Sequence, residues 1–208
     1  MEEVLEVYKR PYDPNRPVVC MDEKPYQLLC DSRALIPASQ CTDGVARQDY
    51  EYVRNGTCSI FIWAEPLGQK RYAEVKAHRT REDWAKGVRD LLEIHYPEAE
   101  KVVLVMDNLN THTIASLYHT FTPDVALSLA NRLELHFTPK HGSWLNIAEI
   151  ELSAMGAQCL TRRIGNMEML ASELSAWQEE RNGRGKSVDW RFTTEDARIK
   201  LRRLYPVI

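Results

Sequence analysis

Two apolar runs that each stop at an aspartate dominate the hydrophobic pattern of this chain. Residues 17–21 have the β-branched, apolar character of a buried strand and are followed by Asp22. Residues 102–106 form the most continuous apolar run, as expected of a strand covered on both sheet faces, and are followed by Asp107. A carboxylate at the end of a buried strand is costly unless it is paired or binds a cation, so both positions are candidate site residues.

The remaining pattern predicts antiparallel strands followed by alternating helices and strands. Residues 24–50 have mixed signals typical of a loop with short extended pieces. Residues 50–53 and 57–64, on either side of Asn55-Gly56, predict a β-hairpin, and residues 71–75 predict one more antiparallel strand. The other predicted elements are a strand over 133–137 and helices over 80–96, 111–121, 123–131, 145–160, 167–181 and 194–203. This order predicts an α/β, ribonuclease H-like fold, a mixed five-stranded sheet with helices on both faces.

Three carboxylates are expected to meet at one edge of this sheet. Ligand sites in open α/β sheets lie beyond the carboxyl ends of parallel strands, where Asp22 and Asp107 are placed, and Glu149 lies on the helix predicted after the last strand. Carboxylates that converge repel one another unless cations lie among them, and oxygen ligands of this kind suit magnesium. Two such ions about 3.5 to 4 Å apart can stabilise the attacking and leaving oxygens of a phosphoryl transfer. Taken alone, either aspartate is equally well explained as a cap or turn residue.

Composition restricts the classes of protein that fit. The chain of 208 residues, 44% of them hydrophobic, is long enough for one compact domain, and its net charge of -3 argues against a strongly basic nucleic-acid module. Its five scattered cysteines include no C-x-x-C pair, which indicates reduced, intracellular thiols. The sequence shows neither a signal peptide nor an apolar stretch near the roughly 20 residues of a membrane span, so we expect a soluble, cytoplasmic protein that is not bound to a membrane.

Three sequence blocks resemble the signature blocks of mariner-type DDE transposases. They are residues 21–25 (MDEKP), 106–112 (MDNLNTH) and 139–149 (PKHGSWLNIAE). The His-Gly-Ser-Trp-Leu-Asn form of the third block resembles the bacterial insertion-sequence branch, whereas eukaryotic relatives usually show Ser-Pro-Asp-Leu-Asn-Pro there. The resemblance is specific from about residue 17 to residue 160 and weaker beyond.

The resemblance implies a catalytic domain in which Asp22, Asp107 and Glu149 bind two Mg²⁺ or Mn²⁺ ions. It implies DNA strand cleavage and strand transfer in cut-and-paste transposition, in which water attacks a phosphodiester at the transposon end and the freed 3′ hydroxyl attacks target DNA. The partners it implies are transposon-end and target DNA, bound by a homodimer at the bacterial nucleoid. Glu151, Glu23 and Asp124 also lie near the blocks and are rivals of Glu149. The family's Asn-x-x-Glu motif favours Glu149, whereas Glu151 points about 200° away on a helix and is expected to be a solvated or interface charge.

Three polar residues near the blocks are candidates to support the carboxylates. His112 could orient Asp107 or hold a phosphate, although a histidine in the first turn of a helix is more often structural. Asn108 and Asn146 are either hydrogen-bonding partners of the carboxylates or turn and cap residues.

A further group of residues is predicted to contact DNA. Trp144 could stack on an unpaired base, although core packing is the favoured interpretation for it. Lys140 and His141 could touch a phosphate, or be ordinary charges of a surface loop. Arg162 and Arg163 begin a basic C-terminal region that could form a DNA-contacting surface, though acidic residues dilute it and a solvated helical surface explains it nearly as well.

The expected organisation is a single catalytic unit with short additions. Residues 1–16, a short helix and a proline-containing connector, are predicted to be a linker remnant; residues 17–160 are the catalytic core; and residues 161–208 are a helical, basic extension of the same domain. Relatives of this type carry helix-turn-helix modules ahead of the core, and Asp22 comes too early for one, so we expect a catalytic half that does not recognise transposon ends by itself.

Two other functions remain open on sequence alone. The first is a truncated, non-enzymatic remnant that regulates a full-length transposase by dimerisation or DNA binding. The second is a general ribonuclease H-like nuclease, against which the His-Gly-Ser-Trp-Leu-Asn block argues.

Overall fold

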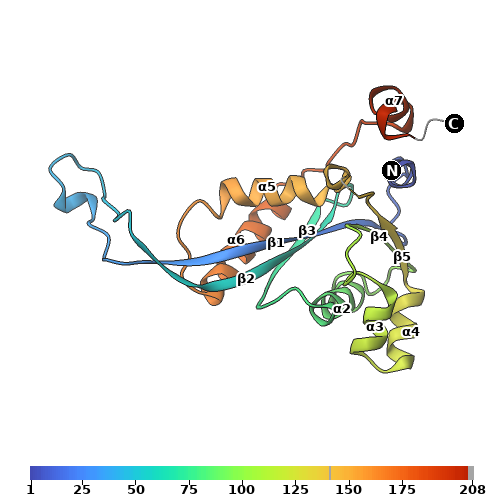
Figure 1. Ribbon diagram of the computed structural model, residues 1–208, viewed down its shortest axis with the longest axis horizontal. Coiled ribbons are helices and arrows are strands. Elements are labelled where there is room, and N and C mark those ends of the chain that lie inside the picture. Colours follow the sequence, from blue (N-terminus) through green and yellow to red (C-terminus); the bar gives the residue numbers. More distant parts are fainter. Residues whose placement is uncertain (141, 206–208) are drawn as a thin grey trace.

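A mixed five-stranded sheet forms the centre of the computed structural model, which describes residues 1–140 and 142–205 (Figure 1). The strands are β1 (Val18–Asp31), β2 (Tyr52–Glu65), β3 (Lys70–Lys76), β4 (Val102–Met106) and β5 (Leu133–Phe137). Their order is β3-β2-β1-β4-β5, with β1–β2 and β2–β3 antiparallel and β1–β4 and β4–β5 parallel. This arrangement confirms the predicted mixed sheet.

Helices cover both faces of the sheet. The longer ones are α1 (Glu2–Tyr8), α2 (Arg81–Asp90), α3 (Ile114–Thr120), α4 (Pro123–Asn131), α5 (Ala148–Gln158), α6 (Met167–Gly183) and α7 (Thr194–Lys200). Short helical turns are η1 (Ala38–Gln40), η2 (Leu91–His95), η3 (Ser143–Leu145) and η4 (Arg202–Leu204). In Figure 1, α5 and α6 lie over one face of the sheet, and α2, α3 and α4 over the other. No helix in the described part of the chain is long and apolar enough to cross a membrane.

Alternation along β1 divides its side chains between two hydrophobic clusters. Val19 and Met21 belong to the cluster that packs against α2, α3 and α4. Cys20 belongs to the cluster on the α5 and α6 side. Because successive strand residues point to opposite faces, Asp22 shares the α5 face with Cys20, and Glu23 shares the α2 face with Met21.

The β1–β2 ribbon differs most from the sequence prediction. β1 continues to Asp31 through residues expected to be loop, and β2 passes through Asn55-Gly56, so the hairpin predicted there is wrong. The pairing shifts between Gln27↔Thr57 and Leu29↔Arg54, so that Asn55 and Gly56 lie opposite Leu28 alone. Gly56 has φ +87°, the conformation of a glycine at a β-bulge. The connection is made instead by residues 32–51, at the far end of a ribbon that projects from the body (Figure 1).

The predicted helix over residues 80–96 is confirmed, and its ends have clear causes. The Thr80 side chain accepts a hydrogen bond from the backbone N–H of Asp83, and the Asp83 side chain accepts one from the Thr80 backbone, which together form a capping box. After Asp90 the helix widens into the π-helical turn η2, which ends before Pro97.

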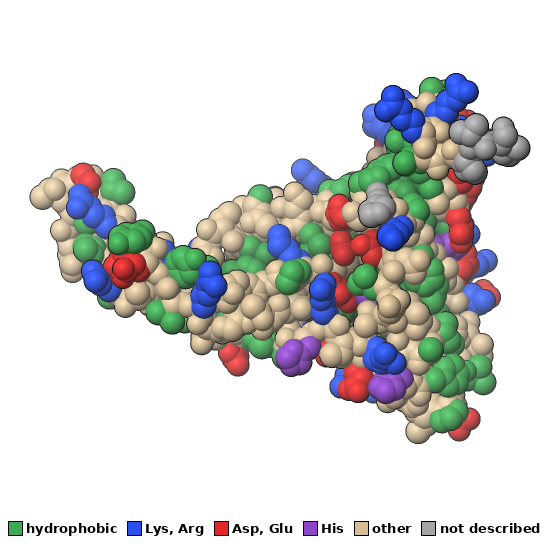
Figure 2. All heavy atoms as spheres, viewed as in Figure 1, with side chains coloured by type: hydrophobic (Ala, Val, Ile, Leu, Met, Phe, Trp, Pro, Cys, Tyr) green, Lys and Arg blue, Asp and Glu red, His purple; other side chains and the backbone are tan. Residues whose placement is uncertain are grey.

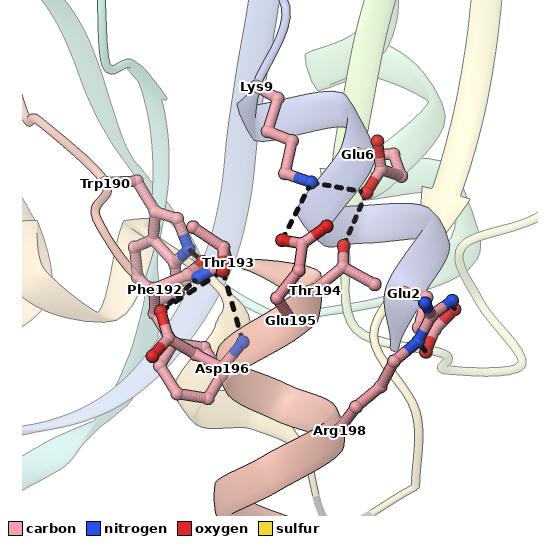
Figure 3. A network of polar contacts seen from close by, with 10 residues as sticks. All are labelled: Glu2, Glu6, Lys9, Trp190, Phe192, Thr193, Thr194, Glu195, Asp196 and Arg198. Carbon is pink, nitrogen blue, oxygen red and sulfur yellow. Dashed lines mark hydrogen bonds and ion pairs between the residues drawn. The ribbon is translucent and has the colours of Figure 1, made fainter.

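The first helix was predicted, but its burial was not. Val4, Leu5 and Val7 of α1 are almost fully buried in the cluster on the α5 face. On the other side of α1, Glu6 accepts hydrogen bonds from Lys9 and Thr194, and Arg198 of α7 pairs with Glu2 (Figure 3). The beginning and the end of the described chain are therefore packed against each other.

Candidate metal centre

Asp22 lies within β1, not at its end as the hydrophobic pattern predicted. β1 pairs with β4 only as far as Cys20↔Val105, and beyond that point it pairs with β2 alone, where Asp22 lies opposite Ile62. The boundary that the pattern detected is therefore the end of the parallel β1–β4 ladder. The backbone N–H of Glu23 donates a hydrogen bond of 2.7 Å to Oδ1 of Asp22.

Asp107 follows the last residue of β4, as predicted. The Thr138 hydroxyl donates to Oδ1 of Asp107 at 2.8 Å, and the Thr138 backbone N–H donates to the Met106 carbonyl at 2.9 Å. Thr138, the residue after β5, thus orients the carboxylate and joins the ends of two strands. Thr138 was not among the predicted site residues, although its place after a strand that ends at the same sheet edge was an available signal.

Glu149 is in the first turn of α5, and its side chain is exposed. The start of this helix is tied to β1 by Asn146, which is 1% exposed. Nδ2 of Asn146 donates to the Met21 carbonyl at 2.8 Å, and Oδ1 accepts from the Ala148 N–H at 3.1 Å. Asn146 therefore links the residue before Asp22 to the residue before Glu149.

The electrostatics of Asp22 reflect both its burial and its neighbouring carboxylates. Burial raises the pKa of Asp22 to about 7, and the negative charges of Asp107, Glu149 and Glu23 act in the same direction. The hydrogen bond from the Glu23 amide opposes this rise without cancelling it. Figure 2 shows acidic side chains gathered near the start of α5. The site thus carries an excess of negative charge.

The donor chemistry of the site fits a hard divalent cation, but the three side chains do not surround one as they stand. Carboxylate oxygens are the ligands that Mg²⁺ and Mn²⁺ prefer. Among residues 1–140 and 142–205, no three His, Cys, Asp or Glu side chains are grouped closely enough to hold one metal ion.

An open hollow of ≈ 290 Å³ adjoins Asp107, and its lining includes Asn108, Thr138, Lys140 and Ser143. Asn108 and Lys140 are exposed. Two of the residues predicted to act beside the carboxylates or on DNA therefore line a space that a ligand can enter next to Asp107.

The other predicted DNA contacts lie in different surroundings. Trp144 is 41% exposed and packs edge-to-face against Phe192 at 5.7 Å, so the favoured core role is wrong. Arg162 pairs with Glu173. His141 lies outside the described residues.

Arg163 has partners within the protein. Its guanidinium pairs with Asp31 at 2.7 Å, donates to the backbone carbonyls of residues 49–51 and lies over the Tyr52 ring. These contacts join the loop before α6 to the projecting ribbon. Arg163 therefore has a structural role that the sequence did not indicate.

Glu151 corrects a further prediction, because it is not a solvated charge. It is fully buried and pairs with Arg71 at 3.0 Å and with Arg181 at 2.5 Å. Burial raises the pKa of Glu151, but the two guanidinium groups outweigh that effect and hold it below the usual value. Glu151 therefore lies away from Glu149 and joins α5 to β3 and α6.

Comparison with known proteins assigns the family. The family model described as "DDE superfamily endonuclease" matches residues 9–171, a range that includes all three carboxylates. The chain belongs to this family. No curated protein matches this DDE endonuclease chain.

A solved structure shares the fold of the DDE endonuclease chain. It is the "Crystal structure of the Mos1 Strand Transfer Complex", which is 19% identical, with a TM-score of 0.56 over 88% of this chain and 54% of that chain. This similarity confirms the predicted ribonuclease H-like fold. The chain spans about half the length of that relative.

Proposed function

We propose that this chain is the catalytic domain of a DNA transposase, which cleaves and joins DNA strands by metal-dependent phosphoryl transfer. The observation that carries the proposal is the set of carboxylates Asp22, Asp107 and Glu149, supplied by β1, the end of β4 and the start of α5. Burial and the other two negative charges raise the pKa of Asp22, as expected where cations are to be bound. Membership of the DDE endonuclease family supports this assignment.

Asp22, Asp107 and Glu149 would hold two Mg²⁺ or Mn²⁺ ions. Such ions, when bound, supply Lewis acidity that stabilises the attacking and leaving oxygens of the phosphate. The protein's own contribution is positional. Thr138 orients the Asp107 carboxylate, and Asn146 holds the start of α5 beside β1. Water attacks one phosphodiester, and the freed 3′ hydroxyl attacks a second, so no covalent bond to the protein is needed.

The proposed partner is DNA, bound across the edge where the carboxylates lie. Lys140 would contact a backbone phosphate beside Asp107, because its side chain is exposed at the hollow there. The Mos1 structure is that of a strand transfer complex, which supports transposon ends and target DNA as substrates. We further propose that the chain acts as a homodimer and belongs to the bacterial insertion-sequence branch, on the basis of the His-Gly-Ser-Trp-Leu-Asn block.

We propose that residues 17–160 are the catalytic core and that residues 161–208 extend the same domain. The buried apolar side chains of α6 and α7 support this division, because Leu170, Leu174 and Ala197 lie in the cluster on the α5 face. Residues 1–16 would lead into this core, with α1 packed against it.

Nicking of supercoiled plasmid by the purified chain in Mn²⁺ tests the proposal. We expect the wild-type chain to nick DNA only when the metal is present and Asp107→Asn to lower the rate on the order of 10³-fold. Asp124→Asn is the matched control, because Asp124 is an exposed aspartate in the first turn of α4. Nicking at the wild-type rate by Asp107→Asn would refute the site.

The same assay addresses the regulatory alternative. A non-enzymatic regulator that binds DNA would bind plasmid equally well with and without the Asp107 carboxylate, whereas one that acts by dimerisation need not bind plasmid. Neither would nick it. The proposed enzyme binds DNA and nicks it.

A further inference from the structure

The two aspartates of the proposed centre are not joined by sheet hydrogen bonds. The last paired residues of the β1–β4 ladder are Cys20 and Val105, two residues before Asp22 and Asp107 respectively. β4 then ends at Met106. The β1–β4 ladder therefore ends before it reaches the two aspartates.

His112 contacts both of the segments that carry the aspartates. Its Nδ1 lies 3.1 Å from the Asp107 carbonyl oxygen, and its Nε2 lies 2.8 Å from Oε1 of Glu23. Glu23 is the neighbour of Asp22 in β1, so a single imidazole ring bridges the two segments that carry the aspartates. His112 is 1% exposed, and the Trp84 ring stacks on it with centroids 5.8 Å apart.

The direction of Glu23 excludes it as a fourth ligand beside Asp22. Glu23 lies opposite Phe61 in the sheet, and Phe61 belongs to the cluster packed against α2, α3 and α4. Asp22 points to the other face, toward the start of α5. Glu23, although adjacent to Asp22 in the chain, therefore points to the opposite face of the sheet.

The hydrogen-bonding chemistry makes the Glu23 carboxyl depend on His112. A carbonyl oxygen only accepts, so the Nδ1–H of His112 donates to Asp107, which leaves Nε2 for the contact with Oε1 of Glu23. The Glu23 side chain is 4% exposed, and its second oxygen, Oε2, has no hydrogen-bond partner among the described residues. Without His112, a buried carboxyl would be left without a side-chain partner.

We propose that His112 and Glu23 are positioning residues that fix the separation of Asp22 and Asp107 from the far face of the sheet. They do not touch metal or DNA in this arrangement. The expected effect on metal affinity rests on the proposed function, whereas the bridge itself is a property of the metal-free protein. The two claims can therefore be tested separately.

Hydrogen–deuterium exchange of the metal-free chain tests the bridge. His112→Phe removes both hydrogen bonds and keeps an aromatic ring against Trp84. We expect backbone amides of residues 107–112 to exchange about tenfold faster in this variant. His136→Phe is the matched control, because His136 is a buried histidine of β5 that also contacts two acceptors, Glu3 and Glu134. It should leave exchange of residues 107–112 unchanged.

Mn²⁺ affinity, measured by the electron paramagnetic resonance signal of the free ion, tests positioning. Glu23→Leu should weaken binding about tenfold, as is usual when a residue that orients a metal ligand is removed. Glu23→Gln should bind as the wild type does, because an amide can make the same contact with His112. Both variants lose the carboxylate charge, but only Glu23→Gln can keep the hydrogen bond, so the pair separates hydrogen bonding from charge. The pair tests the positioning role even if His112→Phe does not fold.

Each result has one meaning. Wild-type exchange in His112→Phe, or equally weak Mn²⁺ binding in Glu23→Gln and Glu23→Leu, would overturn the positioning role. Failure of the wild-type chain itself to bind Mn²⁺ would refute the proposed metal centre, and the exchange comparison would still decide whether the bridge exists.

Discussion

Two glutamates on one helix have opposite surroundings. Glu149 and Glu151 are two residues apart at the start of α5, yet the first is exposed and the second is fully buried. Glu151 is neutralised by Arg71 and Arg181. The negative charge of Glu149 contributes to the raised pKa of Asp22. Residue type and chain position therefore do not distinguish the structural carboxylate of Glu151 from the carboxylate of Glu149 that we propose to bind metal, but the charges around each do.

The two glutamates differ in whether cationic side chains neutralise their charge. A buried carboxylate with two guanidinium partners is satisfied, so its removal harms the fold. A set of carboxylates that lacks cationic partners weakens the fold and is retained where a ligand supplies the missing charge. The variants below test whether loss of DNA nicking and loss of stability can be separated.

The largest expected effect is on activity, from Glu149→Gln. We expect DNA nicking to fall on the order of 10³-fold, about 4 kcal/mol in activation free energy, while the free energy of unfolding changes by less than about 0.5 kcal/mol. Plasmid nicking and urea unfolding measure the two quantities. Glu168→Gln is the control, because Glu168 is an exposed glutamate in the first turn of α6. Equal loss of nicking in both variants would remove any special role for Glu149.

The next effect is on stability, from Glu151→Gln. This change leaves Arg71 and Arg181 without their shared carboxylate, and Arg71 is 1% exposed. We expect the free energy of unfolding to fall by about 3 kcal/mol, measured by urea unfolding.

A triple variant separates the effect of the Glu151 charge from the effect of its side-chain volume. Glu151→Met combined with Arg71→Met and Arg181→Leu removes all three charges and fills similar volumes. We expect it to recover most of the lost stability. A triple variant as unstable as Glu151→Gln would contradict unpaired charge as the cause of the loss.

A smaller effect depends on pH and concerns Asp22→Asn. The pKa of Asp22 is raised from 3.8 to about 7 in the folded state, so the folded protein holds a proton that the unfolded chain releases in this window. Stability should therefore fall as pH rises from about 4 to about 7 and stay low above it. In metal-free buffer, Asp22→Asn should stabilise the fold by about 2 kcal/mol more at pH 8 than at pH 5. A gain that is independent of pH would contradict this origin.

Local patterns made much of the fold predictable. The apolar run of β4 and the alternation of β5 predicted both strands with the bounds found, and Thr80 with its acidic first turn predicted the start of α2. The β1–β2 ribbon was mispredicted because its length depends on pairing between distant segments. Asn55-Gly56 is a local turn signal that this pairing converts into a bulge opposite Leu28.

The candidate site was predictable only in its chemistry. The three carboxylates stand in recognisable sequence blocks. The partners of Glu151 were not predictable, because Arg71 and Arg181 are 80 and 30 residues away. The bridge of His112 to Glu23 spans 89 residues and involves two faces of β1, which no local pattern shows.

The smallest effect comes from the contact that positions Glu149, and Asn146→Ala tests it. This change removes hydrogen bonds to the Met21 carbonyl and the Ala148 N–H, and should lower the free energy of unfolding by about 1 to 2 kcal/mol. It should also slow plasmid nicking, because α5 would no longer be held beside Asp22.

Asn166→Ala is the control for Asn146→Ala. Asn166 caps α6 through a hydrogen bond from the Met169 N–H, so its loss should cost about 1 kcal/mol of stability without slowing nicking. Equal slowing in both variants would mean that nicking follows overall stability. Slowing in Asn146→Ala alone would mean that Glu149, unlike Glu151, contributes to nicking only while Asn146 joins the start of α5 to β1.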